Sequence, residues 1–240
     1  MSKKKIIKKT IITEEVVDVS DELTQIVCIL DRSGSMGMNN LIVEARNGFN
    51  NFIKEQKEIP GRATVTLALF DDKYELLYDN VDLEHVENIT EREWSPRGMT
   101  ALYDAIGETI NTVKSNHKQL KKSKRPDKVL VCIVTDGLEN ASKEYTSDVV
   151  KSLIKDCEKD NWNFIYLAAN QNAFEVGTSL GFSGGNTFTY TNTSDGVGVS
   201  YTNISDAATK YRTVSSTSVD FADLSKNLLA DKDDDKDDEE

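Results

Sequence analysis

The chain has 240 residues, 38% of them hydrophobic, which is enough for one compact domain with a sizeable core. Its 41 Asp and Glu against 29 Lys and Arg give a net charge of −12, which argues against binding to nucleic acid or an anionic membrane, because both need clustered Lys and Arg. No apolar run approaches the ~20 residues of a membrane-spanning helix, and the lysine-rich start lacks the apolar core of a secretion signal.

The first half of the chain predicts two parallel strands, a helix and a hairpin. Residues 1–22 read as an arm with a basic start, and residues 10–19 carry a weak strand pattern. Residues 25–30 form a continuous apolar run, which indicates a strand covered on both faces. A helix is expected over residues 41–53, a strand over 63–70 and its antiparallel partner over 74–78. Residues 80–98 are acidic and irregular.

The second half alternates helices and strands. We expect a helix over residues 100–118, a basic connector over 121–128, and a buried strand over 129–134. A helix at 146–159, a strand at 163–169, a short helix at 173–180, an edge strand at 187–190 and a helix at 199–211 follow. This order predicts an α/β fold with a doubly wound, mainly parallel sheet, one antiparallel strand, and helices on both faces.

The expected organisation is one domain over residues 23–212 and a C-terminal segment over residues 213–240. That segment ends in a tail, residues 231–240, with eight acids and two Lys, which reads as a solvated arm. The three cysteines, Cys28, Cys132 and Cys157, are odd in number and widely spaced, and the first two lie in expected buried strands. Free thiols in a reducing compartment are the plain interpretation, so a cytoplasmic location is predicted.

Short oxygen-bearing side chains gather where the expected strands end. Asp31, Ser33 and Ser35 follow the first strand, Thr100 begins a helix, and Asp136 follows a later strand. In an open α/β sheet these positions share the edge beyond the carboxyl ends of the strands. Two carboxylates and three hydroxyls suit a hard cation such as Mg²⁺, with Mn²⁺ possible, and do not suit zinc.

Each member of this set has a structural alternative. Asp31, Ser33 and Ser35 could form a turn and cap the next helix, Thr100 could be an N-cap, and Asp136 could belong to a simple loop dipeptide. Asp104, one turn into its helix, could support the ligands from behind or could only complement the helix dipole. The shared location of the three segments favours the metal site.

Three segments together resemble the von Willebrand factor A domain: Ile-Leu-Asp-Arg-Ser-Gly-Ser-Met at 29–36, Gly-Met-Thr-Ala-Leu-Tyr-Asp-Ala at 98–105, and Val-Thr-Asp-Gly at 134–137. Asp31, Ser33, Ser35, Thr100 and Asp136 match the metal-ion-dependent adhesion site of that family. The resemblance runs from residue 23 to at least residue 181, with 187–212 as its last strand and helix. Within the family the chain is most similar to small intracellular single-domain members of bacteria and their phages, through residues 47–50, 66–71 and 168–173.

The resemblance implies a divalent-metal-dependent protein-binding module in the cytoplasm (the host cytoplasm for a phage protein), in which Mg²⁺ bridges to an Asp or Glu of a protein partner. No enzymatic activity is expected, because position 33 holds Ser where aspartyl phosphotransferases carry a second acid. A metal-dependent phosphohydrolase or kinase-accessory protein is one alternative, and a structural part of a virion or complex with a vestigial site is another. Since residues 71–93 hold nine acids against Lys73 and Arg92, the partner's acid is expected among neutral or basic neighbours.

Overall fold

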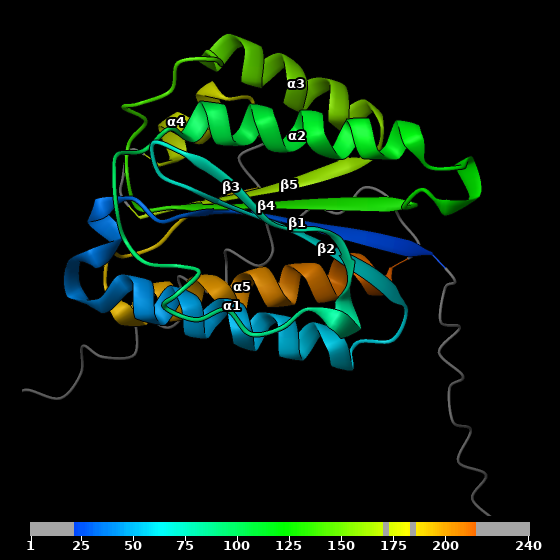
Figure 1. The fold of residues 1–240 in the computed structure, drawn as a ribbon, viewed down its shortest axis with the longest axis horizontal. Coiled ribbons are helices and arrows are strands. Elements are labelled where there is room, and N and C mark those ends of the chain that lie inside the picture. Colours follow the sequence, from blue (N-terminus) through cyan, green and yellow to red (C-terminus); the bar gives the residue numbers. More distant parts are fainter. Residues whose placement is uncertain (1–21, 170–172, 183–185, 215–240) are drawn as a thin grey trace, which may run out of the picture.

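A six-stranded sheet forms the centre of the computed structural model, which describes residues 22–169, 173–182 and 186–214 (Figure 1). The strand order is β3-β2-β1-β4-β5-β6. Only β3 runs antiparallel to its neighbour, and the other pairs are parallel. The fold class predicted from the sequence is therefore confirmed. The strands are β1 (Leu23–Asp31), β2 (Arg62–Phe70), β3 (Tyr74–Asp82), β4 (Lys128–Thr135), β5 (Trp162–Ala168) and β6 (Thr187–Thr189).

Helices cover both faces of this sheet. Figure 1 shows α1 (Leu41–Glu58) and α5 (Ser194–Thr213) side by side below the sheet, and α2 (Leu102–Gln119) and α3 (Ser147–Lys159) above it. A short helix, α4 (Ala173–Ser179), precedes β6. The 3-10 segments are η1 (Gly34–Asn40), η2 (Leu83–His85) and η3 (Lys122–Lys124). None of the described helices is long and apolar enough to cross a membrane.

The core has two layers because successive residues of a strand point to opposite faces. In β1, Ile26, Cys28 and Leu30 pack with residues of α1 and α5, while Val27 and Ile29 pack with residues of α2 and α3. These five side chains are at most 2% exposed. The unbroken apolar run of β1 therefore serves both layers, as expected for a central strand of a parallel sheet.

Two predicted boundaries were wrong. The strand expected at 74–78 continues to Asp82, so residues 80–82 belong to β3 and not to the irregular segment predicted at 80–98. The pairing of β3 with β2 includes a register shift, and Asn80 has φ 52°. The last helix begins at Ser194 rather than at 199, because the Thr193 side chain caps it by accepting a hydrogen bond from the Gly196 N–H. The weak strand pattern at 10–19 and the acidic tail at 231–240 lie outside the described residues.

Lys128 corrects the expected basic connector. It is the first residue of β4 and is buried, with its Nζ 2.7 Å from a Glu22 carboxylate oxygen and 3.4 Å from the Tyr211 carbonyl oxygen. The same ammonium lies 5.7 Å from the centre of the Tyr211 ring. Because a buried ammonium needs such partners, Lys128 holds the end of α5 against the start of β4 and does not belong to a solvated connector.

Candidate metal centre

Two neighbouring strands end at the candidate site. β1 and β4 are parallel and in register from Thr24 and Lys128 to Leu30 and Val134. The order of the strands reverses between them, since β2 lies on the other side of β1 and β5 on the other side of β4. Crevices at such a switch point are the usual binding sites of open α/β sheets. Asp31 ends β1 and Asp136 follows β4, so both carboxylates reach this edge.

Asp31 is held on both of its oxygens. Its Oδ1 accepts a hydrogen bond from the Ser33 N–H at 2.6 Å, and its Oδ2 accepts one from the Thr135 hydroxyl at 2.6 Å. The side chain is 1% exposed. Desolvation raises the pKa of Asp31 to about 6, although the hydrogen bonds from Thr135 and Ser33 oppose that shift. The predicted turn of Asp31 and Ser33 is present, and its hydrogen bond fixes the Asp31 carboxylate at the end of β1.

A chain of hydroxyls links Asp31's turn to Asp136. The Ser33 and Ser35 hydroxyl oxygens lie 3.0 Å apart, and the Ser35 hydroxyl donates to Asp136 Oδ1 at 2.7 Å. The other oxygen, Asp136 Oδ2, is buried and has no hydrogen-bond partner among the described residues. Desolvation raises the pKa of Asp136, and the hydrogen bond from Ser35 opposes that shift. The cluster therefore presents one unsatisfied carboxylate oxygen.

Thr100 completes the group from a different loop. A Cβ placed on Gly137 would lie 2.9 Å from the Thr100 hydroxyl oxygen and 3.6 Å from that of Ser35, so these two hydroxyls flank the same glycine. Helix α2 begins at Leu102 and its N-cap is Ala101. The capping alternative for Thr100 is therefore wrong, and its hydroxyl lies with that of Ser35 beside Gly137.

Residues outside the candidate ligand set hold the loop of Thr100 and the end of β1. Asn140 accepts a hydrogen bond from the Thr100 N–H at 2.9 Å and returns one from its own N–H to the Thr100 carbonyl at 3.0 Å. Trp94 Nε1 donates to the carbonyl of Asp31 at 3.1 Å. Asp104 instead accepts hydrogen bonds from three backbone N–H groups of residues 143–145. Its role toward the ligands stays a prediction.

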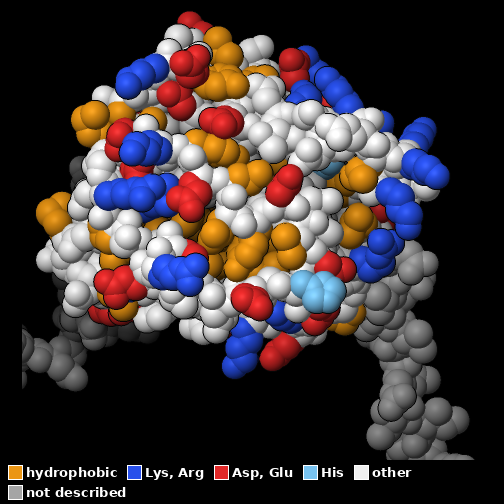
Figure 2. Space-filling model, in the orientation of Figure 1, with side chains coloured by type: hydrophobic (Ala, Val, Ile, Leu, Met, Phe, Trp, Pro, Cys, Tyr) orange, Lys and Arg blue, Asp and Glu red, His pale blue; other side chains and the backbone are white. Residues whose placement is uncertain are grey.

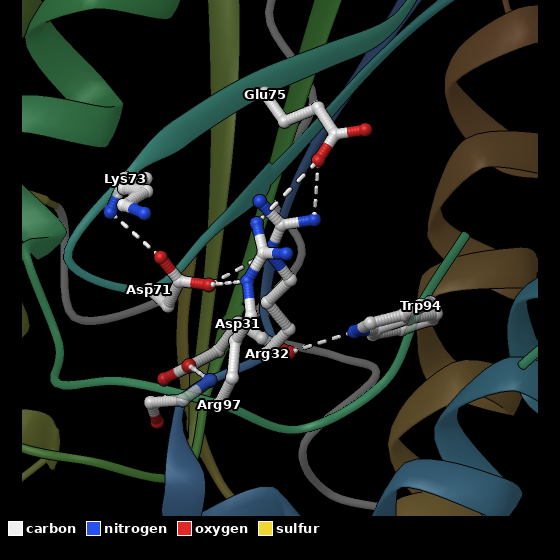
Figure 3. Close-up of polar contacts among 8 residues, drawn as sticks. Asp31, Arg32, Asp71, Lys73, Glu75, Trp94 and Arg97 are labelled. Atoms are coloured by element: carbon white, nitrogen blue, oxygen red, sulfur yellow. Dashed lines mark hydrogen bonds and ion pairs between the residues drawn. The ribbon is translucent and has the colours of Figure 1, made fainter. Parts of the chain in front are cut away.

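An ionic network lies beside the centre (Figure 3). Arg32, 2% exposed, donates from Nε to Asp71 Oδ2 at 3.1 Å and from Nη1 to Glu75 Oε2 at 2.6 Å. Arg97 Nε reaches the same Asp71 oxygen at 2.6 Å, and the Arg97 N–H donates to the Arg32 carbonyl at 2.8 Å. The Asp71 carbonyl in turn accepts from the Ala101 N–H at 2.9 Å. The network therefore fastens residues 97–101 to the ends of β1 and β2.

Gly98 makes the close approach of this loop possible. It has φ +67°, and a Cβ there would lie 2.0 Å from Asp72 Oδ1, while its carbonyl accepts the Gly34 N–H at 3.2 Å.

We expect Gly98→Ala to lower the free energy of unfolding by about 1–2 kcal/mol, because an L residue is strained at this φ. Gly198→Ala, in α5 with no atom within 4 Å of the added Cβ, should raise it by about 0.5–1 kcal/mol. Urea denaturation tests both, and a Gly98→Ala protein as stable as its parent would contradict the strain.

The donor set fits a hard cation. Two carboxylates and three hydroxyls supply only oxygen, which Mg²⁺ and Mn²⁺ prefer, and the unsatisfied Asp136 Oδ2 leaves one buried anionic oxygen for such an ion. Within residues 22–169, 173–182 and 186–214 no group of three or more His, Cys, Asp and Glu could hold a metal. A site here consequently depends on hydroxyl ligands beside its acids.

No protein-family model matches the sequence, and no curated protein matches it. Several solved structures are similar. The vWF domain of the type V pili tip protein Mfa5 from Porphyromonas gingivalis has a TM-score of 0.60 at 11% identity, covering 84% of this chain and 100% of that one. A von Willebrand factor type A structure from Catenulispora acidiphila has a TM-score of 0.52 at 11% identity, covering 77% and 42%.

Proximal thread matrix protein 1 from the mussel byssus is a third similar structure. Its TM-score is 0.56 at 15% identity, with 81% of this chain and 47% of that chain covered. This chain therefore spans about half the length of the mussel protein. Because the identities are low, these three likenesses establish the fold and leave the function to the site.

Proposed function

We propose that this chain, which has the von Willebrand factor A fold, is a divalent-metal-dependent protein-binding module. In this proposal the ion is Mg²⁺, with Mn²⁺ as a substitute, and it bridges to an Asp or Glu side chain of a protein partner. The residues that would hold the ion are Asp31, Ser33, Ser35, Thr100 and Asp136.

The buried, unpartnered Asp136 Oδ2 carries the proposal. A buried anionic oxygen without a donor is costly, and it lies at the end of a chain of hydroxyls that can act as neutral ligands. Both oxygens of Asp31 already accept hydrogen bonds, so part of the acid charge at this edge is satisfied by the protein itself. When bound, the ion would supply incompletely neutralised positive charge, to which a partner's carboxylate is attracted.

The protein's own residues would do the positioning. Thr135 and the Ser33 N–H hold Asp31, Ser35 orients Asp136, and Asn140 fixes the backbone of Thr100. Such supporting hydrogen bonds set the orientation of metal ligands. Ser33, at the place where a phosphotransferase would carry a second acid, supports binding without catalysis.

We also propose a cytoplasmic location. Cys28, Cys132 and Cys157 are free and buried, and burial raises the pKa of the Cys28 thiol to about 12, which keeps it protonated and unreactive. Free thiols of this kind suit a reducing compartment.

Calorimetric titration with Mg²⁺ and Mn²⁺ tests the metal site. We expect the parent to bind the ions and Asp136→Ala to show no detectable binding. Ser33→Ala, which removes one neutral ligand, should bind them with an affinity at least about tenfold lower. The matched control is Asp72→Ala, which removes the same charge from an exposed side chain near Gly98 and should change the affinity less than about twofold.

Two outcomes would overturn the proposal at different points. A parent that binds neither ion would remove the metal from the function. Equal binding by the parent and Asp136→Ala would move the ion away from these residues. Circular dichroism of each variant separates either outcome from a failure to fold.

A further inference from the structure

Three exposed apolar side chains lie in the loops that carry the candidate ligands. Met38, Met99 and Leu138 are 56%, 56% and 50% exposed and are the most exposed large hydrophobic side chains of the described residues. Each lies within three residues of a candidate ligand: Ser35, Thr100 and Asp136, respectively. We call Met38, Met99 and Leu138 the apolar rim. Three separate loops contribute to it, so it is not the by-product of one amphipathic element.

The stretches nearest the apolar rim carry no exposed charge, although exposed Arg97 and Asp72 border the stretch of Met99 and exposed Lys143 and Glu144 follow in the loop of Leu138. Among residues 33–40, 98–100 and 136–140 the exposed positions hold only Gly, Met, Leu and Asn, although 29% of the chain is charged. The two acids in these stretches face inward: Asp136 is 7% exposed, and Glu139 accepts hydrogen bonds from the Tyr103, Ala141 and Ser142 N–H groups. Depletion of charge with enrichment of Met is the composition of the buried centre of protein interfaces.

Hydrogen bonds join the three loops that carry the rim. The Gly34 N–H donates to the Gly98 carbonyl, which joins the loops of Met38 and Met99. The paired hydrogen bonds between Thr100 and Asn140 join the loops of Met99 and Leu138. In Figure 1 these loops lie at the left, where β1 and β4 end, and Figure 2 shows hydrophobic side chains protruding at the same edge. The three loops that carry the rim are therefore joined to one another beside the candidate ligands.

We propose that the partner of this site is a protein segment whose Asp or Glu is flanked directly by apolar side chains. The inference rests on the proposed metal-bridged function. An acid that reaches the centre would place its sequence neighbours near Met38, Met99 and Leu138. Apolar neighbours gain there by burial, whereas a charged neighbour packed against these apolar side chains would lose hydration. In this proposal the metal ion binds the acid of the partner, and the rim selects the residues that flank it.

A displayed library of short peptides with a fixed central Asp or Glu and randomised neighbours tests this inference. Selection on the full chain in Mg²⁺ should recover peptides with apolar residues next to the acid, and selection in EDTA should recover none of them. Recovered peptides should bind Met99→Ser and Leu138→Ser about tenfold more weakly, because each replacement removes one apolar contact at the centre of the interface. Val199→Ser is the matched control: Val199 is 46% exposed on α5, outside the three loops, and its replacement should leave peptide affinity unchanged.

The readouts separate this inference from the metal site. Calorimetric Mg²⁺ affinity should stay within about twofold in Met99→Ser and Leu138→Ser, since neither side chain is a candidate ligand. Suppose that the parent binds metal but the recovered peptides have unbiased or basic neighbours, or that no peptide depends on Mg²⁺. Either result would overturn the proposal of an apolar partner segment and leave the metal site standing. Absence of metal binding in the parent would overturn both.

Discussion

Replacement of Asp71 with Ala is expected to lower the free energy of unfolding by about 3–5 kcal/mol, as measured by urea denaturation. Asp71 is fully buried, and its carboxylate takes hydrogen bonds from Arg32, Arg97 and the Lys73 N–H. Removal of this acid leaves Arg32, itself 2% exposed, with Glu75 as its remaining acid. A buried cation that loses a close partner keeps most of its desolvation cost, which makes the broken pair worse than no pair.

A double variant distinguishes the broken pair from a simple cavity. Arg32→Met with Asp71→Leu should regain most of the lost stability, because apolar side chains of similar volume replace both charges. The surface control is Lys159→Ala, which breaks a 2.8 Å pair with Asp156 in which both side chains are more than half exposed, and it should cost at most about 0.5 kcal/mol. A loss for Asp71→Ala no larger than this control would contradict the stabilising role of the network.

The same variant should also weaken Mg²⁺ binding. Asp71 holds Arg97 through its side chain and Ala101 through its carbonyl, and Thr100 lies between these two residues. When the carboxylate is removed, the loop that carries Thr100 loses one of its anchors. A calorimetric titration at a temperature where the variant is folded is expected to show a decrease of about tenfold, the size found when groups that support metal ligands are removed.

The sequence was sufficient to place the central strands and to predict that the candidate ligands meet at one edge of the sheet. β1 and β4 are continuous apolar runs, and such runs indicate strands covered on both faces whatever their partners. Because the fold class places the carboxyl ends of parallel strands at one edge, the residues that follow each run could be brought together without coordinates. The hydrogen bonds that link Ser33, Ser35 and Asp136 agree with that placement.

The supporting residues could not be found in this way, because their role depends on pairing between distant segments. Arg32 and Arg97 resemble ordinary surface charges in the sequence, and their burial or pairing follows from β2 placing Asp71 beside the end of β1. Asn140 has no local signal that would connect it with Thr100, forty residues away. The true start of α5 was hidden because Gly196 and Gly198 are poor helix formers, whereas the packing of α5 on α1 outweighs that preference.

Asp31→Asn is expected to change how stability depends on pH. Burial raises the pKa of Asp31 to about 6 in the native protein, against about 3.9 in an unfolded chain. Between these values the native state binds more protons than the unfolded state, so the free energy of unfolding of the parent should fall as the pH rises from about 4 to about 6. The difference between the two pKa values corresponds to about 3 kcal/mol.

The variant isolates this contribution. In EDTA, the stability of the parent minus that of Asp31→Asn should decrease by about 3 kcal/mol between about pH 4 and pH 7, because the amide does not titrate and the other groups are common to both proteins. A difference independent of pH would show that Asp31 is not held at a raised pKa. Added Mg²⁺ at neutral pH should stabilise the parent more than the variant, since an ion that binds the native state favours it by mass action. That result would mean that the Asp31 carboxylate lowers the stability of the metal-free domain at neutral pH and contributes charge to the proposed ion site.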